Sequence, residues 1–191
     1  SNSATENGGA IYNFAIGFDS TATISAITGD FSSNEATSGG AIYNDSNPDA
    51  TATIGIINGS FTKNLAQHGG AIYNGNSGGS CIISNITSDF TENSATTDGG
   101  AIYNTGTITI KAQNDKDIKF ENNYVTSSTG KGGAIYNESS GLINLCADAG
   151  RNITFVGGAD DTTNNKYNID GIYNDATLFT FPSGTKYVEI K

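Results

Sequence analysis

The stretch Gly39-Gly40-Ala41-Ile42-Tyr43-Asn44 decides the fold, because the same six residues return along the chain at a nearly constant spacing. The first glycines of the intact copies stand at positions 8, 39, 69, 99 and 132, so the spacing is 31, 30, 30 and 33 residues. A degenerate copy of the motif follows at Asp170-Gly171-Ile172-Tyr173-Asn174. A period of roughly 20–50 residues is typical of solenoids, so the repeat governs the domain organisation.

Each repeat carries two further signals. One has the form Phe-x-x-Asn and occurs at 31–34, 61–64, 90–93 and 120–123. The other is a run in which β-branched residues alternate with others, such as Thr51-Ala52-Thr53-Ile54 and the equivalent Thr107-Ile108-Thr109-Ile110. Alternation with period two indicates strands. We therefore expect about three short strands per repeat, joined by turns of Gly, Asn, Asp and Ser.

Three strands per turn at constant length predict an all-β fold, a single-stranded parallel β-helix (a pectin-lyase-like solenoid) with about 30 residues per repeat. Every strand would pair with its equivalent one repeat later, so like residues would stack into columns. An aliphatic column would contain Ile11, Ile42, Ile72, Ile102, Ile135 and Ile172, and an aromatic column would contain Phe31, Phe61, Phe90 and Phe120.

Asparagine is expected to form structural ladders at the bends. Its amide carries both a donor and an acceptor, and it tolerates left-handed backbone geometry. A stacked column of amides satisfies its own hydrogen bonds. The main ladder would consist of Asn13, Asn44, Asn74, Asn104, Asn137 and Asn174, and a second one of Asn34, Asn64, Asn93 and Asn123. The paired glycines would allow a corner too tight for a side chain.

A column of tyrosines is the candidate interaction strip. If the isoleucines point inward, alternation turns their neighbours outward. An inward tyrosine would need a buried partner for its hydroxyl in every repeat, which favours the outward orientation. The alternatives are an inward tyrosine column and an outward column that serves only to stack. The strip consists of Tyr12, Tyr43, Tyr73, Tyr103, Tyr136 and Tyr173.

The whole chain, 1–191, is predicted to be one β-helix segment and a fragment of a longer repeat array. Repeats are regular over 1–137 and irregular over 138–191, where an exposed loop at 160–165 and a final rung or two (turns of the solenoid) at 176–191 are expected. Cys81 aligns with Ala52 at an inward position and Cys146 with Lys111 at an outward one, two repeats apart. That separation is roughly 10 Å at the usual strand spacing, beyond the reach of a disulfide, so two free thiols are expected.

Charge and composition narrow the function. Nine basic and nineteen acidic residues give a net charge of -10, which disfavours nucleic acid and anionic membranes as partners. No run of apolar residues is long enough to span a bilayer, so we expect no membrane insertion by this segment.

No catalytic residues, metal ligands or cofactors are predicted. Parallel β-helices also host enzymes that cleave polysaccharides, which need carboxylates converging on one face. His68 stands at a variable position and is expected to be solvated, since sibling repeats hold Asn7, Ser38, Asp98 and Lys131 there. Acidic turns at 45–49 and 115–117 could hold calcium. The sequence has no calcium-binding nonapeptide of the Gly-Gly-x-Gly-x-Asp type, so solubilising turn residues are the favoured interpretation.

Together, Gly-Gly-Ala-Ile and Phe-x-x-Asn resemble the paired motifs of the chlamydial polymorphic outer membrane proteins. The longer Gly-Gly-Ala-Ile-Tyr-Asn form resembles autotransporter passenger domains and adhesin-like surface proteins. This resemblance covers about residues 2–174 and implies a right-handed β-helix at a prokaryotic cell surface, either attached to the outer membrane or secreted.

The function expected from this resemblance is non-enzymatic adhesion or self-association. Partners would be a glycan or protein of a host or neighbouring cell, or a second copy of the chain. The alternative from another class is a β-helical carbohydrate-active enzyme or a tailspike-like glycan-binding protein.

Overall fold

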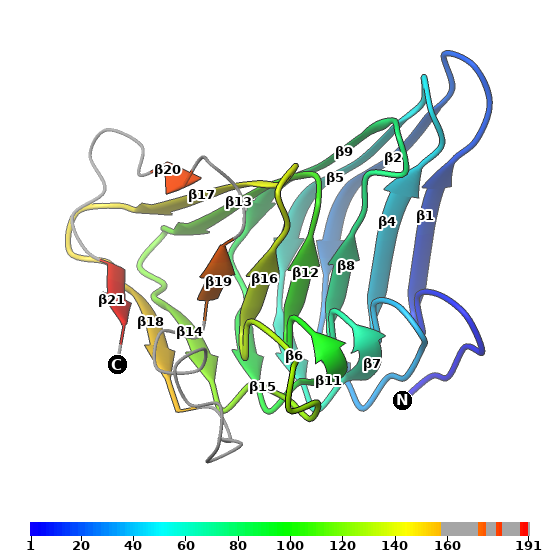
Figure 1. Ribbon diagram of the computed structural model, residues 1–191. Helices are drawn as coiled ribbons and strands as arrows, with labels where there is room; N and C mark the ends of the chain where they lie inside the picture. The colour runs from blue at the N-terminus through cyan, green and yellow to red at the C-terminus, as the bar shows by residue number, and fades with distance from the viewer. Residues whose placement is uncertain (158–171, 175–178, 181–187, 191) are drawn as a thin grey trace.

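The computed structural model describes residues 1–157, 172–174, 179–180 and 188–190. Its regular elements in that part of the chain are all β-strands, which wind into a parallel β-solenoid with roughly 30 residues per turn (Figure 1). The predicted all-β parallel β-helix is therefore confirmed. The loop expected at 160–165 lies outside the described residues.

Three sheets of six strands run along the rod. The tyrosine and threonine sheets take their names from residues on their outer side, and the phenylalanine sheet takes its name from the residues on its inner side. The tyrosine sheet contains β1 (Ile11–Ala15), β4 (Ile42–Ser46), β8 (Ile72–Asn74), β12 (Ile102–Asn104), β16 (Ile135–Asn137) and β19 (Ile172–Asn174). The threonine sheet contains β2 (Thr21–Thr28), β5 (Thr51–Asn58), β9 (Ser80–Ile86), β13 (Thr107–Ala112), β17 (Leu142–Ala147) and β20 (Phe179–Thr180). The phenylalanine sheet contains β3 (Phe31–Ser32), β6 (Ser60–Thr62), β10 (Asp89–Thr91), β14 (Ile118–Glu121), β18 (Ile153–Val156) and β21 (Val188–Ile190).

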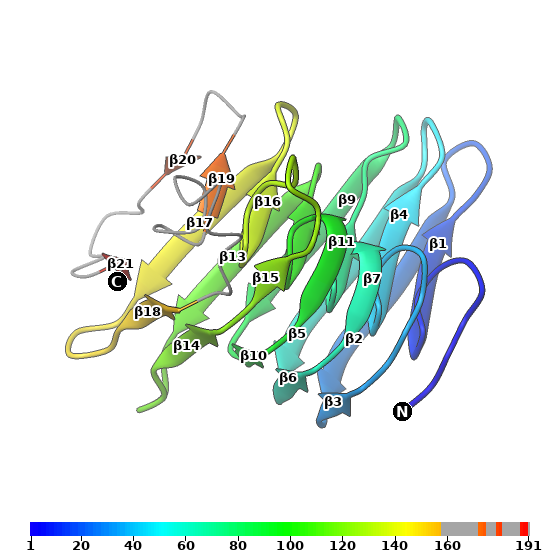
Figure 2. The ribbon, with the colours of Figure 1, turned by 60° about the horizontal axis from the view of Figure 1, so that its bottom comes forward.

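A fourth sheet of three strands was not predicted. This short sheet consists of β7 (Leu65–His68), β11 (Ser94–Asp98) and β15 (Tyr124–Val125), and it lies between the phenylalanine and tyrosine sheets along the chain. Figure 2 shows its strands side by side along the middle of the rod. The expectation of about three strands per repeat is therefore one strand too low in three repeats.

Strand pairing brings equivalent residues into register, as the repeat predicts. Ile42, Tyr43 and Asn44 pair with Ile72, Tyr73 and Asn74, and the same register continues along the whole tyrosine sheet. The phenylalanines also pair with one another, and Phe155 extends their column by one member. In the threonine sheet Thr107 pairs with Ile82, and Ile82 pairs with Thr53; a separate irregularity shifts the register between Ile108 and Ile110. Thr107 thus stacks under Thr53 rather than under Thr51, where the sequence alignment placed it.

The core is a narrow apolar interior between the sheets. The isoleucines of β4, β8, β12 and β16 and the phenylalanines of β6, β10, β14 and β18 are almost completely buried. A second, smaller cluster of Ala15, Ala50, Ala52 and Cys81 lies beyond the asparagine ladder, where β1, β4 and their partners in the threonine sheet are longest. The isoleucine column therefore points inward, and its tyrosine neighbours point to the other side.

The glycine pair makes the corner that leads into the tyrosine sheet. Gly39 has φ +61°, a left-handed conformation that side chains disfavour. At Gly40 a Cβ atom would lie 2.2 Å from the carbonyl oxygen of Gly70 in the next rung. Consecutive rungs thus approach so closely that neither position accepts a side chain without movement of the backbone.

Candidate interaction surface

The tyrosine column forms a continuous stack of rings on the outer side of the tyrosine sheet. Successive ring centroids from Tyr12 to Tyr136 lie 5.2, 5.0, 5.0 and 5.1 Å apart. The first three pairs are nearly parallel, with interplanar angles of 4°, 8° and 4°. Tyr173 continues the column as a strand partner of Tyr136, but its side chain lies outside the described residues.

The exposure of the tyrosine rings is uneven. Tyr12 is 55% exposed, whereas Tyr43 and Tyr136 are only 9% and 8% exposed. Tyr73 and Tyr103 lie between these limits. Because each inner ring has a neighbour on both faces, only ring edges and hydroxyl groups reach the surface in the middle of the strip. Tyr12 alone among the described tyrosines of the strip is highly exposed.

Two acidic residues hold tyrosine hydroxyls in place. The hydroxyl of Tyr43 donates to Oδ2 of Asp45 at 2.7 Å, and that of Tyr103 donates to Oε2 of Glu138 at 3.1 Å. Burial, followed by the charge of Asp45, raises the pKa of Tyr73 to about 12. Burial also raises the pKa values of Tyr43 and Tyr103 well above the ordinary value, followed by the effect of the carboxylate beside each. These three hydroxyls are therefore neutral at physiological pH.

Asp45 is a buried carboxylate satisfied by protein donors. It is 2% exposed and accepts hydrogen bonds from the backbone nitrogens of Ser46 and Ser77 at 2.8 and 3.0 Å. The hydroxyl of Ser77 donates to Oδ2 of Asp45 at 2.8 Å. Sequence reasoning placed Asp45 in an exposed acidic turn, and that interpretation was wrong. Its donors come from two adjacent turns of the solenoid, so Asp45 links the end of β4 to the segment that follows β8.

The asparagines next to the tyrosines form a ladder through the rod. The Nδ2 atom of each donates to Oδ1 of the next, at 2.7 Å from Asn13 to Asn44, 2.8 Å for the next two steps and 2.7 Å from Asn104 to Asn137. A parallel ladder joins Asn34, Asn64, Asn93 and Asn123 at 2.8 to 2.9 Å. The described side chains of both ladders are buried, so they hold the rungs together rather than presenting a surface.

The left-handed residues of the second ladder are not the asparagines themselves. Ser33, Lys63, Glu92 and Asn122, each one position before a ladder asparagine, have φ between 53° and 56°. The turn directs the next residue inward, where its Oδ1 atom accepts both the backbone nitrogen and the amide of the asparagine one rung earlier. The expected tolerance of asparagine for this geometry therefore does not explain its place in the column.

His68 is half-buried, so the expectation that it is solvated was wrong. Its ring packs edge-on against Tyr103, with the centroids 5.3 Å apart, and its Nδ1 atom lies 3.9 Å from Oδ2 of Asp98. The position forms a column in which Asn7, Ser38, His68, Asp98 and Lys131 follow one another. Burial raises the pKa of Asp98 above its usual range. This variable column borders the tyrosine strip.

The cysteines are free, as expected, with Cys81 buried and Cys146 partly exposed. Burial raises the pKa of Cys81 to about 11, so its thiol is protonated and unreactive at neutral pH. Within the described residues, no three His, Cys, Asp or Glu side chains come together as a metal site. The same part of the chain contains no helix with the length and apolar character of a membrane span.

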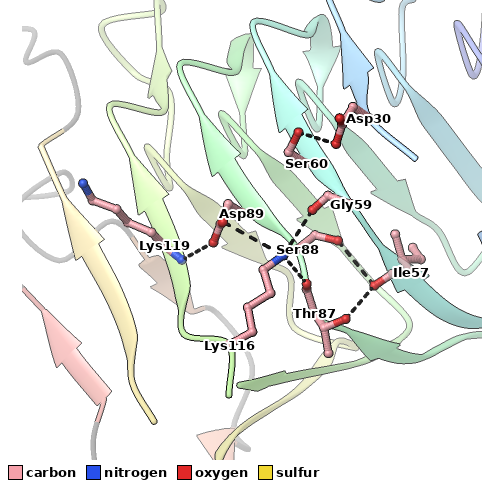
Figure 3. A network of polar contacts seen from close by, with 9 residues as sticks. All are labelled: Asp30, Ile57, Gly59, Ser60, Thr87, Ser88, Asp89, Lys116 and Lys119. Carbon is pink, nitrogen blue, oxygen red and sulfur yellow. Dashed lines mark hydrogen bonds and ion pairs between the residues drawn. The ribbon is translucent and has the colours of Figure 1, made fainter. Parts of the chain in front are cut away.

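Lys116 bridges several residues at the corner between the threonine and phenylalanine sheets, as Figure 3 shows. The ammonium group of Lys116 donates to the carbonyl oxygens of Thr87 at 2.8 Å and Gly59 at 3.5 Å, and lies 4.0 Å from Oδ2 of Asp89. Two carbonyls and a carboxylate are ligands that a bound cation would use. Here the lysine of a later rung takes that place, so the cluster joins three rungs.

Fold and surface together define a repeat-built β-solenoid whose side chains stack in columns. Four segments, 29–45, 58–75, 80–105 and 117–138, match the family model described as the Chlamydia polymorphic membrane protein repeat. Each segment contains one Phe-x-x-Asn motif and one Gly-Gly-Ala-Ile-Tyr-Asn motif. These four segments of the chain are therefore similar to polymorphic membrane protein repeats, and together with the β-solenoid they fit a surface β-helix of the autotransporter type. No curated protein and no solved structure is significantly similar to the chain.

Proposed function

We propose that this chain is a non-enzymatic segment of a cell-surface β-helix and mediates adhesion or self-association through its outer faces. The observation that carries the proposal is a division between invariant and variable columns. The inward isoleucine, phenylalanine and asparagine columns repeat one residue from rung to rung and maintain the rod. Some outward columns change from rung to rung, as in the column of Asn7, Ser38, His68, Asp98 and Lys131, whereas the outward tyrosine strip keeps one residue.

In a rod of this kind, the residues that stabilise the fold differ from those that contact a partner. Each rung contacts mainly its neighbours, so outward residues can vary without loss of the stack. The family of the matched repeats supports a surface location in general terms. Partners of the proposed adhesin are a glycan or protein on a host or neighbouring cell, or a second copy of this chain.

For self-association, the tyrosine strip is the proposed contact. Its middle offers ring edges and hydroxyls rather than open ring faces, which suits another protein surface better than the flat face of a sugar. Tyr73 and Tyr103 are the partly exposed members at its centre.

Sedimentation at increasing protein concentration tests self-association. The parent chain is expected to associate, and a double variant with Tyr73→Ser and Tyr103→Ser is expected to remain monomeric while keeping its circular dichroism spectrum. A matched double variant, Thr53→Ser and Thr109→Ser, changes the outer face of the threonine sheet and should associate like the parent. If the parent is monomeric at every concentration, self-association is excluded, and adhesion then depends on a glycan or protein partner.

A further inference from the structure

An open groove of about 750 Å³ lies along the outer side of the short sheet, away from the tyrosine strip. This volume falls within the range of roughly 300–1,000 Å³ that small-molecule sites occupy. Its lining is mixed, with two large apolar side chains, one small side chain and polar groups: Leu65, Tyr124, Ser94, Lys63, Glu92, Asn122 and Gly157.

The floor of the groove is a gap in a column. Ser94 pairs with Leu65 in the preceding rung and with Tyr124 in the following one. Each of the three is followed along its strand by a buried residue, Ala66, Ala95 or Val125, and Ser94 is itself only 8% exposed at the floor of the groove between its larger neighbours. Two large side chains thus flank one small side chain, and Ser94 leaves the space that a stacked ring would fill in a regular column.

The gap has the thickness of one ring. Strands in a sheet lie about 4.8 Å apart, so Leu65 and Tyr124, two strands apart, are separated by roughly 9.6 Å along the rod. A ring inserted between them needs a contact of about 3.5–4.0 Å on each side, or roughly 7–8 Å. The phenylalanine column shows that this rod accommodates such stacking, with ring centroids 4.7 to 4.9 Å apart.

Tyr124 differs from the tyrosines of the strip in having no stacked neighbour. Among the described residues no aromatic ring packs on it, whereas both faces of Tyr73 are covered. Leu65 is 38% exposed, although it is apolar. Within the described residues, the groove therefore offers a partly exposed aromatic ring without an aromatic neighbour and an aliphatic side chain on opposite sides of one gap.

Polar groups line the rest of the groove. The ammonium group of Lys63 lies 3.4 Å from Oε2 of Glu92, and both side chains are well exposed. With the amide of Asn122, they supply donors and acceptors next to the gap. Hexopyranoses combine an apolar C–H face with a rim of hydroxyl groups that both donate and accept hydrogen bonds.

We propose that the gap over Ser94 is a carbohydrate site in which one hexopyranose ring inserts between Leu65 and Tyr124. Its apolar face packs on the ring of Tyr124, and its hydroxyls bond with Lys63, Glu92 and Asn122. The proposal rests on the adhesive function proposed above and assigns it a ligand class at a place separate from the tyrosine strip.

Binding of methyl β-D-glucopyranoside and methyl β-D-galactopyranoside, followed by saturation-transfer NMR and chemical-shift titration, tests the site. At least one glycoside should bind the parent with millimolar affinity, and Tyr124→Ala should weaken it at least tenfold. Ser94→Leu should weaken it as strongly, because it fills the gap. The matched variant Ser84→Leu places the same side chain at an exposed position of the threonine sheet and should bind like the parent.

The unfolding midpoint of Ser94→Leu should equal or exceed that of the parent, which separates filling from misfolding. Failure of both glycosides to bind, or unchanged binding by Ser94→Leu, overturns the proposal. Binding of N-acetylphenylalanine amide at the gap, without glycoside binding, would assign it to a protein side chain and overturn the carbohydrate site. Sedimentation of Ser94→Leu should match the parent, so the two proposals fail independently.

Discussion

Two aromatic columns run along the same rod with almost the same spacing, yet their surroundings differ. Phenylalanine centroids lie 4.7 to 4.9 Å apart inside the sheets, and tyrosine centroids lie 5.0 to 5.2 Å apart outside them. Parallel pairing in register stacks any aromatic residue that repeats. Stacking therefore does not distinguish a structural column from a surface column, but the side of the sheet on which the column lies does.

The largest difference between the columns should be in stability. Phe90→Ala removes a fully buried ring that is stacked on both sides, so the free energy of unfolding should fall by about 3–5 kcal/mol. Tyr73→Ala removes a ring that is partly exposed, and the loss should be about 1–2 kcal/mol. Urea unfolding at neutral pH measures both. Equal losses would show that the outer column supports the rod as much as the inner one.

The asparagine ladder extends the comparison between inner and outer columns. Each ladder asparagine follows a tyrosine of the strip in the sequence, but its side chain points inward. Asn74→Ala leaves the amide of Asn44 and Oδ1 of Asn104 without their ladder partner in a buried place, so a loss of about 2–4 kcal/mol is expected. Asn76→Ala, at an exposed position two residues on, should change stability by less than about 0.5 kcal/mol. Similar values for both variants would mean that the ladder contributes nothing.

A smaller effect is expected from the tyrosine hydroxyls. Tyr103→Phe keeps the ring and removes the hydrogen bond to Glu138, which should cost about 0.5–1.5 kcal/mol in thermal or urea unfolding. Tyr73→Phe is the control, since no hydrogen bond to the Tyr73 hydroxyl is found among the described residues. A loss in Tyr73→Phe as large as in Tyr103→Phe would contradict the role given to Glu138.

Of the two aromatic columns, only the tyrosine column should make a contribution to stability that depends on pH in the alkaline range. The pKa of Tyr73 is raised from 10.0 to about 12, so the unfolded chain ionises first and the stability present below pH 10 is lost as pH rises toward 12. At pH 10.5 this loss should be below about 1 kcal/mol for Tyr73. The fall in unfolding free energy between pH 9 and 10.5 should be smaller in Tyr73→Phe than in the parent, and an identical fall would contradict the raised pKa.

Much of the fold was predictable because the chemistry of the repeated residues determines where each of them lies. Isoleucine and phenylalanine at fixed spacing predict the core, and asparagine with donor and acceptor predicts the ladders. The short sheet was missed because Leu65–His68 lacks β-branched residues, and its pairing follows from the sheets on either side. The position of Thr107 under Thr53 was missed because the repeats were matched by residue type, with Thr107 as the equivalent of Thr51, and not by strand pairing.

The surface was less predictable than the core. The sequence favoured an outward tyrosine column, but ring exposure depends on turns whose paths it does not specify. Asp45 is buried because donors from Ser77 in the next rung reach it, and His68 is half-buried because Tyr103 lies beside it. The gap over Ser94 becomes visible only when Leu65 and Tyr124 are known to pair with it, since no motif marks the short sheet.

Hydroxyl-radical footprinting of the folded chain with mass spectrometry tests the division between inner and outer columns most directly. Tyr12 should be oxidised fastest, Tyr73 and Tyr103 more slowly, and Tyr43 and Tyr136 slower still, while Phe61, Phe90 and Phe120 stay protected until the chain is unfolded in urea. Oxidation of Phe90 in the native chain as fast as Tyr73 would contradict the account, because the two columns would then be equally accessible.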